Sequence, residues 1–215
     1  MSGYLIPTVT EVTPRGERLT DIFSRMLGER IVFLGTAIDD GVANVVIAQL
    51  LHLAAAEPSR DIHLYLNSPG GSYTAMTAIL DTMEFVAPDV ATLCVGQAAA
   101  CAAVLLAAGT PGKRGVLRHA RVMLHQPESG LRRGSLSDLA VEAGDLERVR
   151  READEVIAAA TGRDVSQVRA DTDRALILPG RHAVDYGIAD YVATRSGGQT
   201  HAEPIGPGDR RAITP

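Results

Sequence analysis

The chain has 215 residues, of which 46% are hydrophobic and 22% charged, and its formal net charge at pH 7 is −5. This length and apolar content predict one domain with a substantial core. No run of about 18 apolar residues suggests a membrane span, and the acidic charge balance argues against a nucleic-acid partner. The N-terminal residues lack the basic region and apolar stretch of a signal peptide, so we expect a cytoplasmic protein.

The N-terminal part of the chain predicts an extended segment followed by a helix. Residues 1–17 contain Pro7 and Pro14, which oppose helix formation, so this segment is either an extended arm or a frayed terminus. In Leu19–Leu27 apolar residues recur three and four positions apart, which predicts a helix. The apolar run Ile31–Leu34 predicts a short buried strand.

Residues 42–108 alternate between helical and strand patterns. The predicted order is helix 42–55, strand 62–66, helix 76–86, strand 90–95 and an alanine-rich helix to 108. In the first helix the apolar residues are spread widely enough to predict that most of them are buried: Val45, Val46, Leu50, Leu51 and Leu53. Strands that alternate with helices at this spacing predict an α/β fold with a largely parallel sheet. Right-handed crossovers then place the loops after the strands at one edge of the sheet.

The second half of the chain begins with two short strands, 116–117 and 121–124, around a turn. Ser135–Thr161 predicts the longest helix, and Gly162 is a candidate left-handed cap. Because one face of this helix is apolar and the other is charged, it either covers the core or projects from the domain. Further helices are predicted at 165–173 and 183–187 and a last strand at 189–193, while the polar, Gly- and Pro-rich segment 196–215 predicts a disordered tail.

A run of small residues, Gly96–Leu106, follows the predicted strand 90–95 and opens the next helix. A strand that turns abruptly into a helix leaves several N–H groups without partners and points the positive end of the helix dipole at whatever lies above. That is the geometry of an oxyanion site, and in serine hydrolases the same turn presents the nucleophile. The presenting position here is Ala100, which has no reactive side chain.

Four motifs follow one another along the chain: Asn67–Gly71, Gly96–Cys101, Arg121–Pro127 and Asp171–Ala175. In this order and spacing they resemble the Clp-type serine peptidase family, the proteolytic subunits that work beneath AAA+ unfoldases. The resemblance extends from about Tyr4 to Arg195, which is nearly the whole chain. Segments between the motifs, such as Arg15–Arg18 and Gly109–Arg114, match as well.

The resemblance implies the repeated β-α units of the Clp and crotonase folds, with helix 135–161 protruding as a handle. It implies an axial arm or loop at 1–17, a peptidase domain at 18–195 and a tail at 196–215. Subunits of the family form stacked heptameric rings around a degradation chamber, and an ATP-consuming AAA+ unfoldase feeds unfolded proteins into it. We therefore expect the chain to bind itself or a paralogous subunit and to need neither a metal nor another cofactor of its own.

Carried over position by position, the family's catalytic serine falls on Ala100, its base on His125 and its acid on Ala175. The nucleophile and the carboxylate are therefore both missing, although Asp171 or Asp173 is a possible substitute for the acid. Loss of a triad nucleophile lowers the rate about a million-fold, or about 8 kcal/mol of barrier. The chain as written is therefore expected not to cleave peptide bonds.

Other family positions carry over in the same way. The oxyanion-hole N–H groups fall on Gly71 and Cys101, and backbone groups survive side-chain substitution. Two cysteines, Cys94 and Cys101, cannot make a disulfide framework, and neither has metal-ligand spacing with a histidine. We therefore interpret both as buried thiols. The alternative is that Cys101 is a replacement nucleophile. Arg174 falls on a residue that links ring contacts to the active state.

The pocket on which the unfoldase docks falls on His63, Tyr65 and Phe85. An aromatic residue is common where His63 stands, so this histidine argues against direct docking on rings of this chain alone. Its titration near neutral pH would modulate the same pocket. The alternative is that His63 is a plain histidine at the edge of the core.

Two explanations of the missing serine stay open. Ala100 is either an engineered replacement or the mark of a naturally inactive subunit that assembles with active paralogues, and Ala175 favours the second because one substitution is enough to abolish catalysis. A purely structural ring subunit is compatible with the same family. A rival from another class is a crotonase-type acyl-CoA enzyme, which also pairs two backbone N–H groups as an oxyanion hole and needs no serine.

Overall fold

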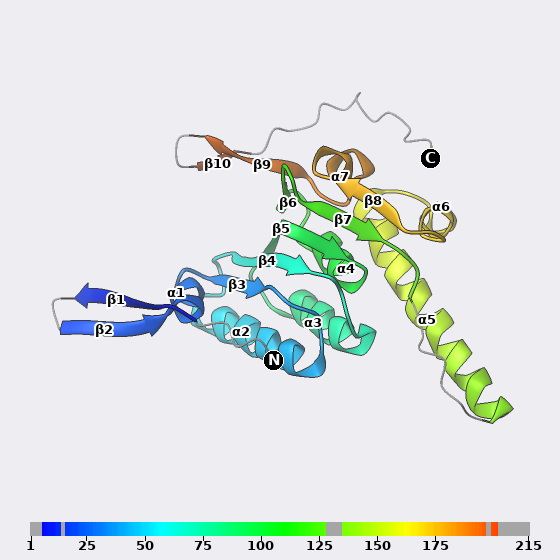
Figure 1. The fold of residues 1–215 in the computed structure, drawn as a ribbon, viewed down its shortest axis with the longest axis horizontal. Helices are drawn as coiled ribbons and strands as arrows, with labels where there is room; N and C mark the ends of the chain where they lie inside the picture. Colours follow the sequence, from blue (N-terminus) through cyan, green and yellow to red (C-terminus); the bar gives the residue numbers. More distant parts are fainter. Residues whose placement is uncertain (1–5, 14–15, 128–134, 197–198, 202–215) are drawn as a thin grey trace.

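A computed structural model describes residues 6–13, 16–127, 135–196 and 199–201 of the chain (Figure 1). Its helices are α1 (Ile22–Gly28), α2 (Asp40–Ala56), α3 (Tyr73–Phe85), α4 (Cys101–Ala107), α5 (Leu136–Thr161), α6 (Val165–Asp171) and α7 (Arg181–Tyr186). Its strands are β1 (Thr8–Thr13), β2 (Gly16–Asp21), β3 (Ile31–Leu34), β4 (Ile62–Ser68), β5 (Val90–Ala99), β6 (Arg114–Leu117), β7 (Arg121–Leu124), β8 (Leu176–Pro179), β9 (Tyr191–Ser196) and β10 (Gln199–His201). Among the described residues, no helix is long and apolar enough to cross a membrane.

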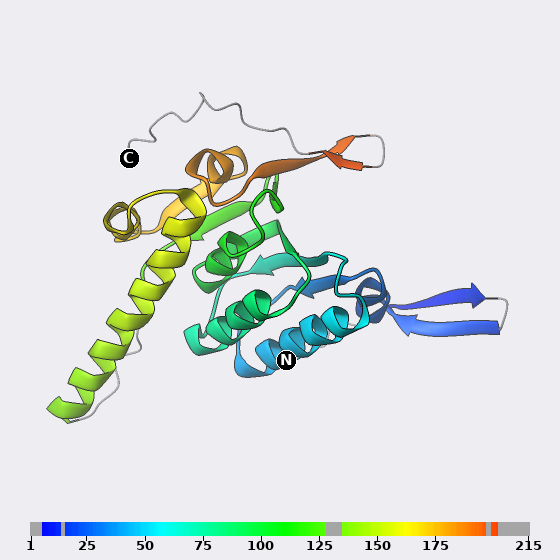
Figure 2. The same ribbon diagram turned by 180° about the vertical axis from the view of Figure 1, so that it is seen from behind.

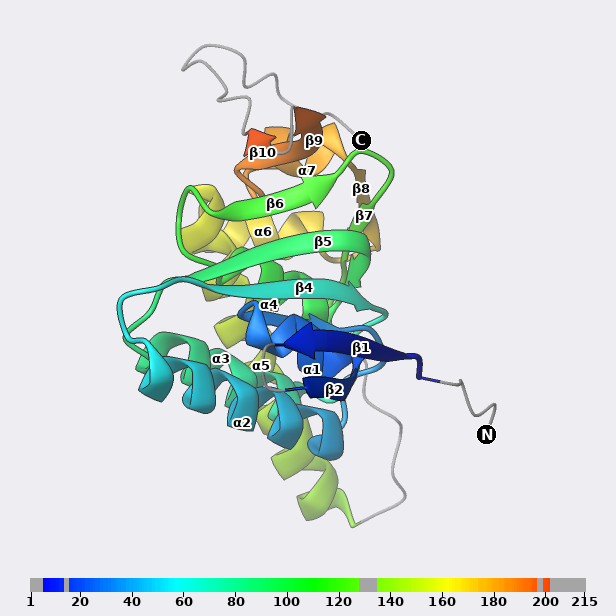
Figure 3. The same cartoon turned by 90° about the vertical axis from the view of Figure 1, so that its left-hand side faces the viewer.

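The centre of the molecule is a sheet in the order β10-β9-β6-β5-β4-β3, with β7 and β8 continuing from β5. The pairs from β3 through β4, β5 and β6 to β9, and the pair β5·β7, are parallel, which confirms the predicted α/β fold. In Figure 3 β4, β5 and β6 cross the view in front of α4 and α5. The core lies between this sheet and the helices, and it includes Leu64, Leu50 and Leu105, whose full burial contributes roughly 1.5–3 kcal/mol each.

The N-terminal segment is a β-hairpin rather than an isolated arm. β1 and β2 pair antiparallel, so the extended conformation predicted for 1–17 is found at 8–13 and continues through Asp21. The helix predicted from Leu19 begins only at Ile22, because the Asp21 carboxylate caps it by accepting from the N–H groups of Phe23 and Ser24. Leu19 pairs with Thr10 in the hairpin and is exposed, so it was wrongly included in the helical pattern.

Helix α2 buries a single stripe of side chains. Asp39 caps it by accepting from the Val42 N–H, and the buried residues are Ala43, Val46, Leu50 and Leu53. The prediction that most of its apolar residues are buried was wrong for Val45 and Leu51, which are 58% and 43% exposed. The sheet and α3 cover only one side of this helix, so the remaining apolar residues face outward.

A buried arginine fastens the end of α2 to the sheet. The guanidinium of Arg30 donates to the carbonyl oxygens of Leu53, Glu57, Arg60 and Asp61 at 2.8–3.2 Å. Its positive charge therefore lies at the C-terminal end of α2, where the helix dipole favours a cation. This single side chain fixes the turn that leads from α2 into β4.

Helix α5 has the boundaries that its caps predict. Ser135 and Asp138 form a capping box at its start, and Gly162 ends it in the left-handed conformation at φ 69°. Buried residues occur only in its C-terminal half, at Ala153, Asp154, Ile157, Ala158 and Thr161. Figures 1 and 2 show the other half extending away from the sheet, at the opposite end of the molecule from the β1–β2 hairpin. Of the two predicted roles, projection describes the first half and core packing the second.

The C-terminal part differs from the prediction in two strands. The antiparallel pairing of β8 with β7 was not predicted, because Leu176–Pro179 is short and ends in proline. β10 pairs antiparallel with β9, so residues 199–201 form a strand within the segment where a disordered tail was predicted from 196. The rest of the predicted tail, residues 202–215, lies outside the described residues.

Candidate active site

The last two residues of β4, Asn67 and Ser68, hold the end of this strand against β5 and shape the loop that follows. Asn67 Oδ1 accepts from the Gln97 N–H at 3.2 Å, and a β-carbon at Gly96 would lie 2.4 Å from this oxygen. Ser68 is fully buried, and its Oγ accepts from the Gly70 N–H at 3.1 Å. The polar side chains of this motif therefore shape the loop, and Gly96 leaves the space for the anchor.

The two glycines of the same loop are required by close backbone contacts. Ile38 donates to the Gly70 carbonyl and accepts from the Ser72 N–H, both at 2.8 Å. A β-carbon at Gly71, where φ is +155°, would lie 2.1 Å from the Ile38 carbonyl oxygen. A β-carbon at Gly70 would lie 3.0 Å from the β-carbon of Ala100, so the loop passes directly beside the predicted nucleophile position.

Ala100 occupies a strained turn between β5 and α4. Its φ and ψ are 48° and −117°, a region that residues other than glycine rarely adopt. Its N–H donates to the Met123 carbonyl at 2.9 Å, and its carbonyl accepts from Ala103 at 2.9 Å as α4 begins. This is the abrupt strand-to-helix turn that presents a nucleophile in hydrolases, with a methyl group in the presenting position.

The two predicted oxyanion positions lie side by side. The Cys101 thiol donates to the Gly71 carbonyl at 3.2 Å, which ties the first turn of α4 to the glycine loop. As the first residue of α4, Cys101 has an N–H without an intrahelical acceptor. The thiol is fully buried, and this burial raises its pKa to about 11, so it is protonated at neutral pH. Replacement of the serine by this thiol is therefore not supported.

His125 follows β7, the parallel neighbour of β5, so it lies at the same edge of the sheet as Ala100. Its Nδ1 lies 2.7 Å from the Gln126 carbonyl oxygen. When Nδ1 carries the proton it donates to this carbonyl, and Nε2 is left as the acceptor that a base requires. Gln126 is itself held in place, since its N–H donates to the Thr172 carbonyl at 3.0 Å. A backbone carbonyl that is itself held in place thus orients the His125 ring.

Strand register places residue 175 beside the predicted base. β7 and β8 pair antiparallel up to Leu124 opposite Leu176, so His125 and Ala175 both adjoin this last pair. Ala175 also lines a recess of about 360 Å³ with Asp171, Asp173 and Arg174 among its walls. The position predicted for the acid is therefore next to the base, and the side chain there is a methyl group.

The two substitute carboxylates differ in their surroundings. Asp171 accepts a hydrogen bond from the Tyr186 hydroxyl at 2.9 Å and lies 3.9 Å from the Arg163 guanidinium, so it is already engaged at the end of α6. Asp173 is exposed, and its carbonyl accepts from the Gln126 amide. Asp173 is thus the freer of the two. The predicted ring-contact residue, Arg174, is exposed between Asp173 and the acid position.

The predicted docking residues come from β4 and from the end of α3. His63 and Tyr65 lie on β4, on the face of the sheet opposite the buried Ile62, Leu64 and Leu66. Phe85 ends α3, on the helix-covered side, and is 80% exposed. His63 is exposed at its edge of the strand, and partial desolvation of its ring lowers its pKa below the usual 6.5, with Asp61 opposing.

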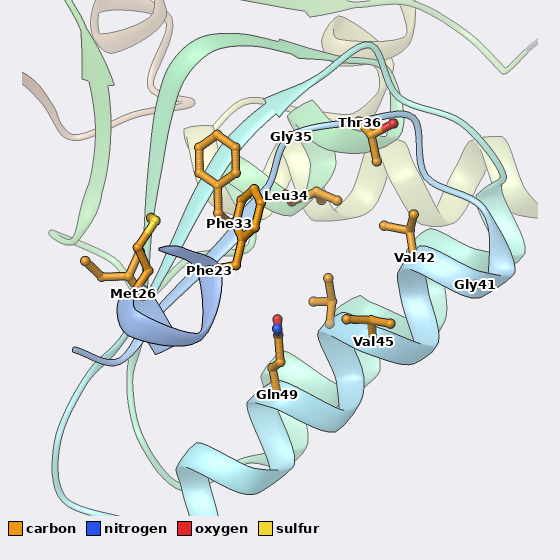
Figure 4. Close-up of a pocket in the computed structure, with 12 residues that line it drawn as sticks. Phe23, Met26, Phe33, Leu34, Gly35, Thr36, Gly41, Val42, Val45 and Gln49 are labelled. Atoms are coloured by element: carbon orange, nitrogen blue, oxygen red, sulfur yellow. The ribbon is translucent and has the colours of Figure 1, made fainter. Parts of the chain in front are cut away.

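Figure 4 shows a separate apolar recess of about 410 Å³ between α1, β3 and α2. Phe23 and Phe33, whose ring centroids are 6.1 Å apart, lie on one side, and Val42 and Val45 lie on the other. None of the predicted catalytic or docking residues lines it. In the part of the chain that the structure describes, no group of acidic, cysteine or histidine residues is arranged to hold a metal ion.

Comparison with known sequences decides between the families that this geometry allows. The sequence model of the Clp protease family matches residues 14–196. The chain belongs to the Clp protease family. The match spans the glycine loop, the Ala100 turn and the His125 strand, so the crotonase-type alternative is set aside.

Individual members of the family are similar over most of their length. The ATP-dependent Clp protease proteolytic subunit 2 of Streptomyces avermitilis is 56% identical over 195 residues, which cover 91% of this chain and 98% of the relative. Subunit 4 of Rhodococcus jostii is 58% identical over 190 residues, covering 88% and 97%. Subunit 1 of Corynebacterium glutamicum is 50% identical over 191 residues, covering 89% and 92%.

Sequence reasoning missed the groups that position the site. The Gln126 carbonyl gives no sequence signal, because every residue has one. Ile38 also gave none, since its contact with the glycine loop joins segments that are distant in the sequence. The pairing of β7 with β8 was detectable in principle, because Leu176–Leu178 is apolar and follows the acid motif.

Proposed function

We propose that this chain is a non-cleaving subunit of a Clp-type proteolytic particle, assembling with itself or with an active paralogous subunit in stacked rings. The observation that carries the proposal is Ala100, whose backbone forms the nucleophile turn while its side chain offers only a methyl group. The glycine loop lies against Ala100, α4 begins directly after it, and His125 follows the neighbouring strand β7. In this proposal the groups around the nucleophile position are retained, and only the attacking oxygen atom is missing from the turn.

The chemistry of the family explains why this substitution is decisive. In acyl transfer by a triad, the serine oxygen attacks the carbonyl, the histidine takes its proton and backbone N–H groups hold the oxyanion. Here Gly71, Cys101 and His125 supply the last two functions, but no oxygen is present to attack. Removing the nucleophile costs about a million-fold in rate, and the remaining groups recover only about 10³–10⁴-fold over water.

The missing carboxylate at position 175 favours a naturally inactive subunit over an engineered one. The pairing of β7 with β8 brings His125 and residue 175 to the same end of this strand pair, which supports Ala175 as the acid position. One replacement at position 100 is enough to abolish cleavage, so a loss at position 175 adds nothing to an engineered trap. Loss of both the nucleophile and the acid is expected when selection no longer maintains catalysis but still maintains another property of the subunit.

Assembly is the property that the structure supports. Helix α5 projects from the domain and presents Leu136, Leu139 and Val141, whose exposure has no purpose in an isolated protomer. Exposed apolar side chains on a projecting helix fit against a second copy or a paralogue. In the proposed particle an AAA+ unfoldase consumes the ATP and supplies unfolded protein in the cytoplasm, and this chain needs no cofactor.

Native mass spectrometry of the 22.7 kDa chain, alone and mixed with an active paralogous subunit, tests the proposal directly. A fluorophosphonate probe for nucleophilic serines is added to the same samples. We expect assemblies that contain this chain, with probe on the paralogue and none on this chain. Probe on this chain, or monomers in both samples, contradicts the proposal.

A pair of variants locates the contact. Replacing Leu136 and Val141 together by serine is expected to shift the particle toward single rings or protomers. The matched control is Val165→Ser, which removes an exposed apolar side chain from α6 instead. Equal effects of the two changes rule out α5 as the assembly element.

A further inference from the structure

One residue from each of five neighbouring strands forms a row across the sheet. The strand pairings place the following in register: Phe33 on β3, Tyr65 on β4, Leu93 on β5, Gly115 on β6 and Tyr191 on β9. Side chains along a strand alternate between faces, and the neighbours of this row are buried against the helices. The row therefore lies on the other face, where β4, β5 and β6 stand in front of α4 and α5 in Figure 3.

Gly115 makes a gap in this row, and Tyr191 fills it. A β-carbon at position 115 would lie 2.9 Å from Cε2 and Cζ of the Tyr191 ring and 2.8 Å from Cδ1 of Leu93. The ring thus lies over β6, in the volume that a side chain at 115 would take. Burial of the ring raises the pKa of the Tyr191 hydroxyl, with Tyr65 and Asp190 adding to the shift. Tyr65, one of the predicted docking residues, lies in the same row on β4.

We propose that the Tyr191 ring fills the space over Gly115 on this face and thereby prevents an apolar side chain of a docking partner from binding there. The inference rests on the proposed function, because it concerns the surface that the family resemblance assigns to unfoldase docking. A partner loop tipped with an aliphatic or aromatic side chain matches the chemistry of the row. It gains entry only after the tyrosine ring leaves its contacts with Gly115 and Leu93.

The expected effect follows from apolar burial. Burying a leucine-sized side chain corresponds to roughly tenfold to a hundredfold in binding. A partner that must first displace the Tyr191 ring into solvent therefore binds more weakly by a factor of this size. The competing explanation is structural, since an aromatic ring that covers a glycine on the neighbouring strand stabilises a sheet. Only the proposed role predicts that removal of the ring creates a binding site.

The test uses three forms of the full chain: the wild type, Tyr191→Ala, and Tyr191→Ala combined with Gly115→Leu. The double variant refills the same space from β6. The probe is the peptide Ser-Gly-Leu-Gly-Ser, with Ser-Gly-Ser-Gly-Ser as its control, and the reporter is the Leu93 methyl resonance in a ¹³C-methyl-labelled protein. Tyr191→Leu, which keeps the strand covered with a smaller side chain, serves if the alanine variant does not fold.

We expect the leucine peptide to give a saturable Leu93 shift in Tyr191→Ala, at an affinity at least about tenfold above that of the wild type and of the double variant. Equal binding to wild type and Tyr191→Ala, or binding that persists in the double variant, overturns the proposal. The reporter lies within one protomer, so the result does not depend on assembly. Particle size, measured on the same samples, reports separately on the proposed function.

Discussion

The glycine loop beside Ala100 offers a sharp test of how the site is held. In Gly71→Ala the new β-carbon would lie 2.1 Å from the Ile38 carbonyl oxygen and 2.7 Å from its nitrogen, so the loop has to move away from Ile38. That movement breaks the two backbone hydrogen bonds between Ile38 and the loop, at about 0.5–1.5 kcal/mol each. The positive φ adds about 1–2 kcal/mol, giving a total of roughly 2–5 kcal/mol.

Gly112→Ala is the matched control, because Gly112 has a φ of +84° and no atom within 4 Å of the new β-carbon. It is expected to cost only the conformational term of about 1–2 kcal/mol. Urea unfolding of both variants, read at equal slope, gives the difference between them. Equal losses in the two variants refute the conclusion that Ile38 fixes the loop that carries the oxyanion position.

Two further predictions concern buried or partly buried charge. Arg150 Nε and Asp154 Oδ2 are buried 3.9 Å apart without a hydrogen bond, and burial raises the pKa of Asp154 despite this neighbour. Asp154→Leu alone should therefore lower the free energy of unfolding, measured in urea, by about 3–5 kcal/mol. Arg150→Met combined with Asp154→Leu should leave it unchanged or raise it by up to about 4 kcal/mol. A double variant that is less stable than the single variant contradicts this prediction. The lowered pKa of His63 means that the unfolded chain takes up its proton first, so stability falls as the pH drops below about 6.5. His63→Phe should flatten this loss in unfolding midpoints between pH 7 and 5, and an unchanged slope contradicts the assignment.

Elements with strong local signals could be predicted from the sequence. Ser135 and Gly162 mark the ends of α5 by their own chemistry, and the apolar run Ile31–Leu34 has the same bounds as β3. Elements that depend on partners were not predicted. Leu19 fits a helical pattern but is held in a hairpin opposite Thr10, and β8 is a strand because β7 is beside it.

The same division applies to the candidate site. The motifs identify Ala100, His125 and the glycine loop as candidates, because specific residue types are required there, and their catalytic roles stay predictions. The hydrogen bond from His125 to the Gln126 carbonyl and the packing of Tyr191 over Gly115 depend on backbone geometry and strand register. No residue type in the sequence predicts these two contacts, so only the three-dimensional structure shows them.

The measurement that tests the central claim most directly is hydrolysis of a short fluorogenic peptide by the wild type, Ala100→Ser and Ala100→Ser with Ala175→Asp. The wild type is predicted to be inactive and Ala100→Ser to cleave, because the turn, the oxyanion groups and His125 are in place. The added carboxylate should raise the rate further, by up to about 10⁴-fold, since it stabilises the charged imidazole that a backbone carbonyl only orients. Hydrolysis by the wild type, or no hydrolysis by the double variant in intact particles, contradicts the account.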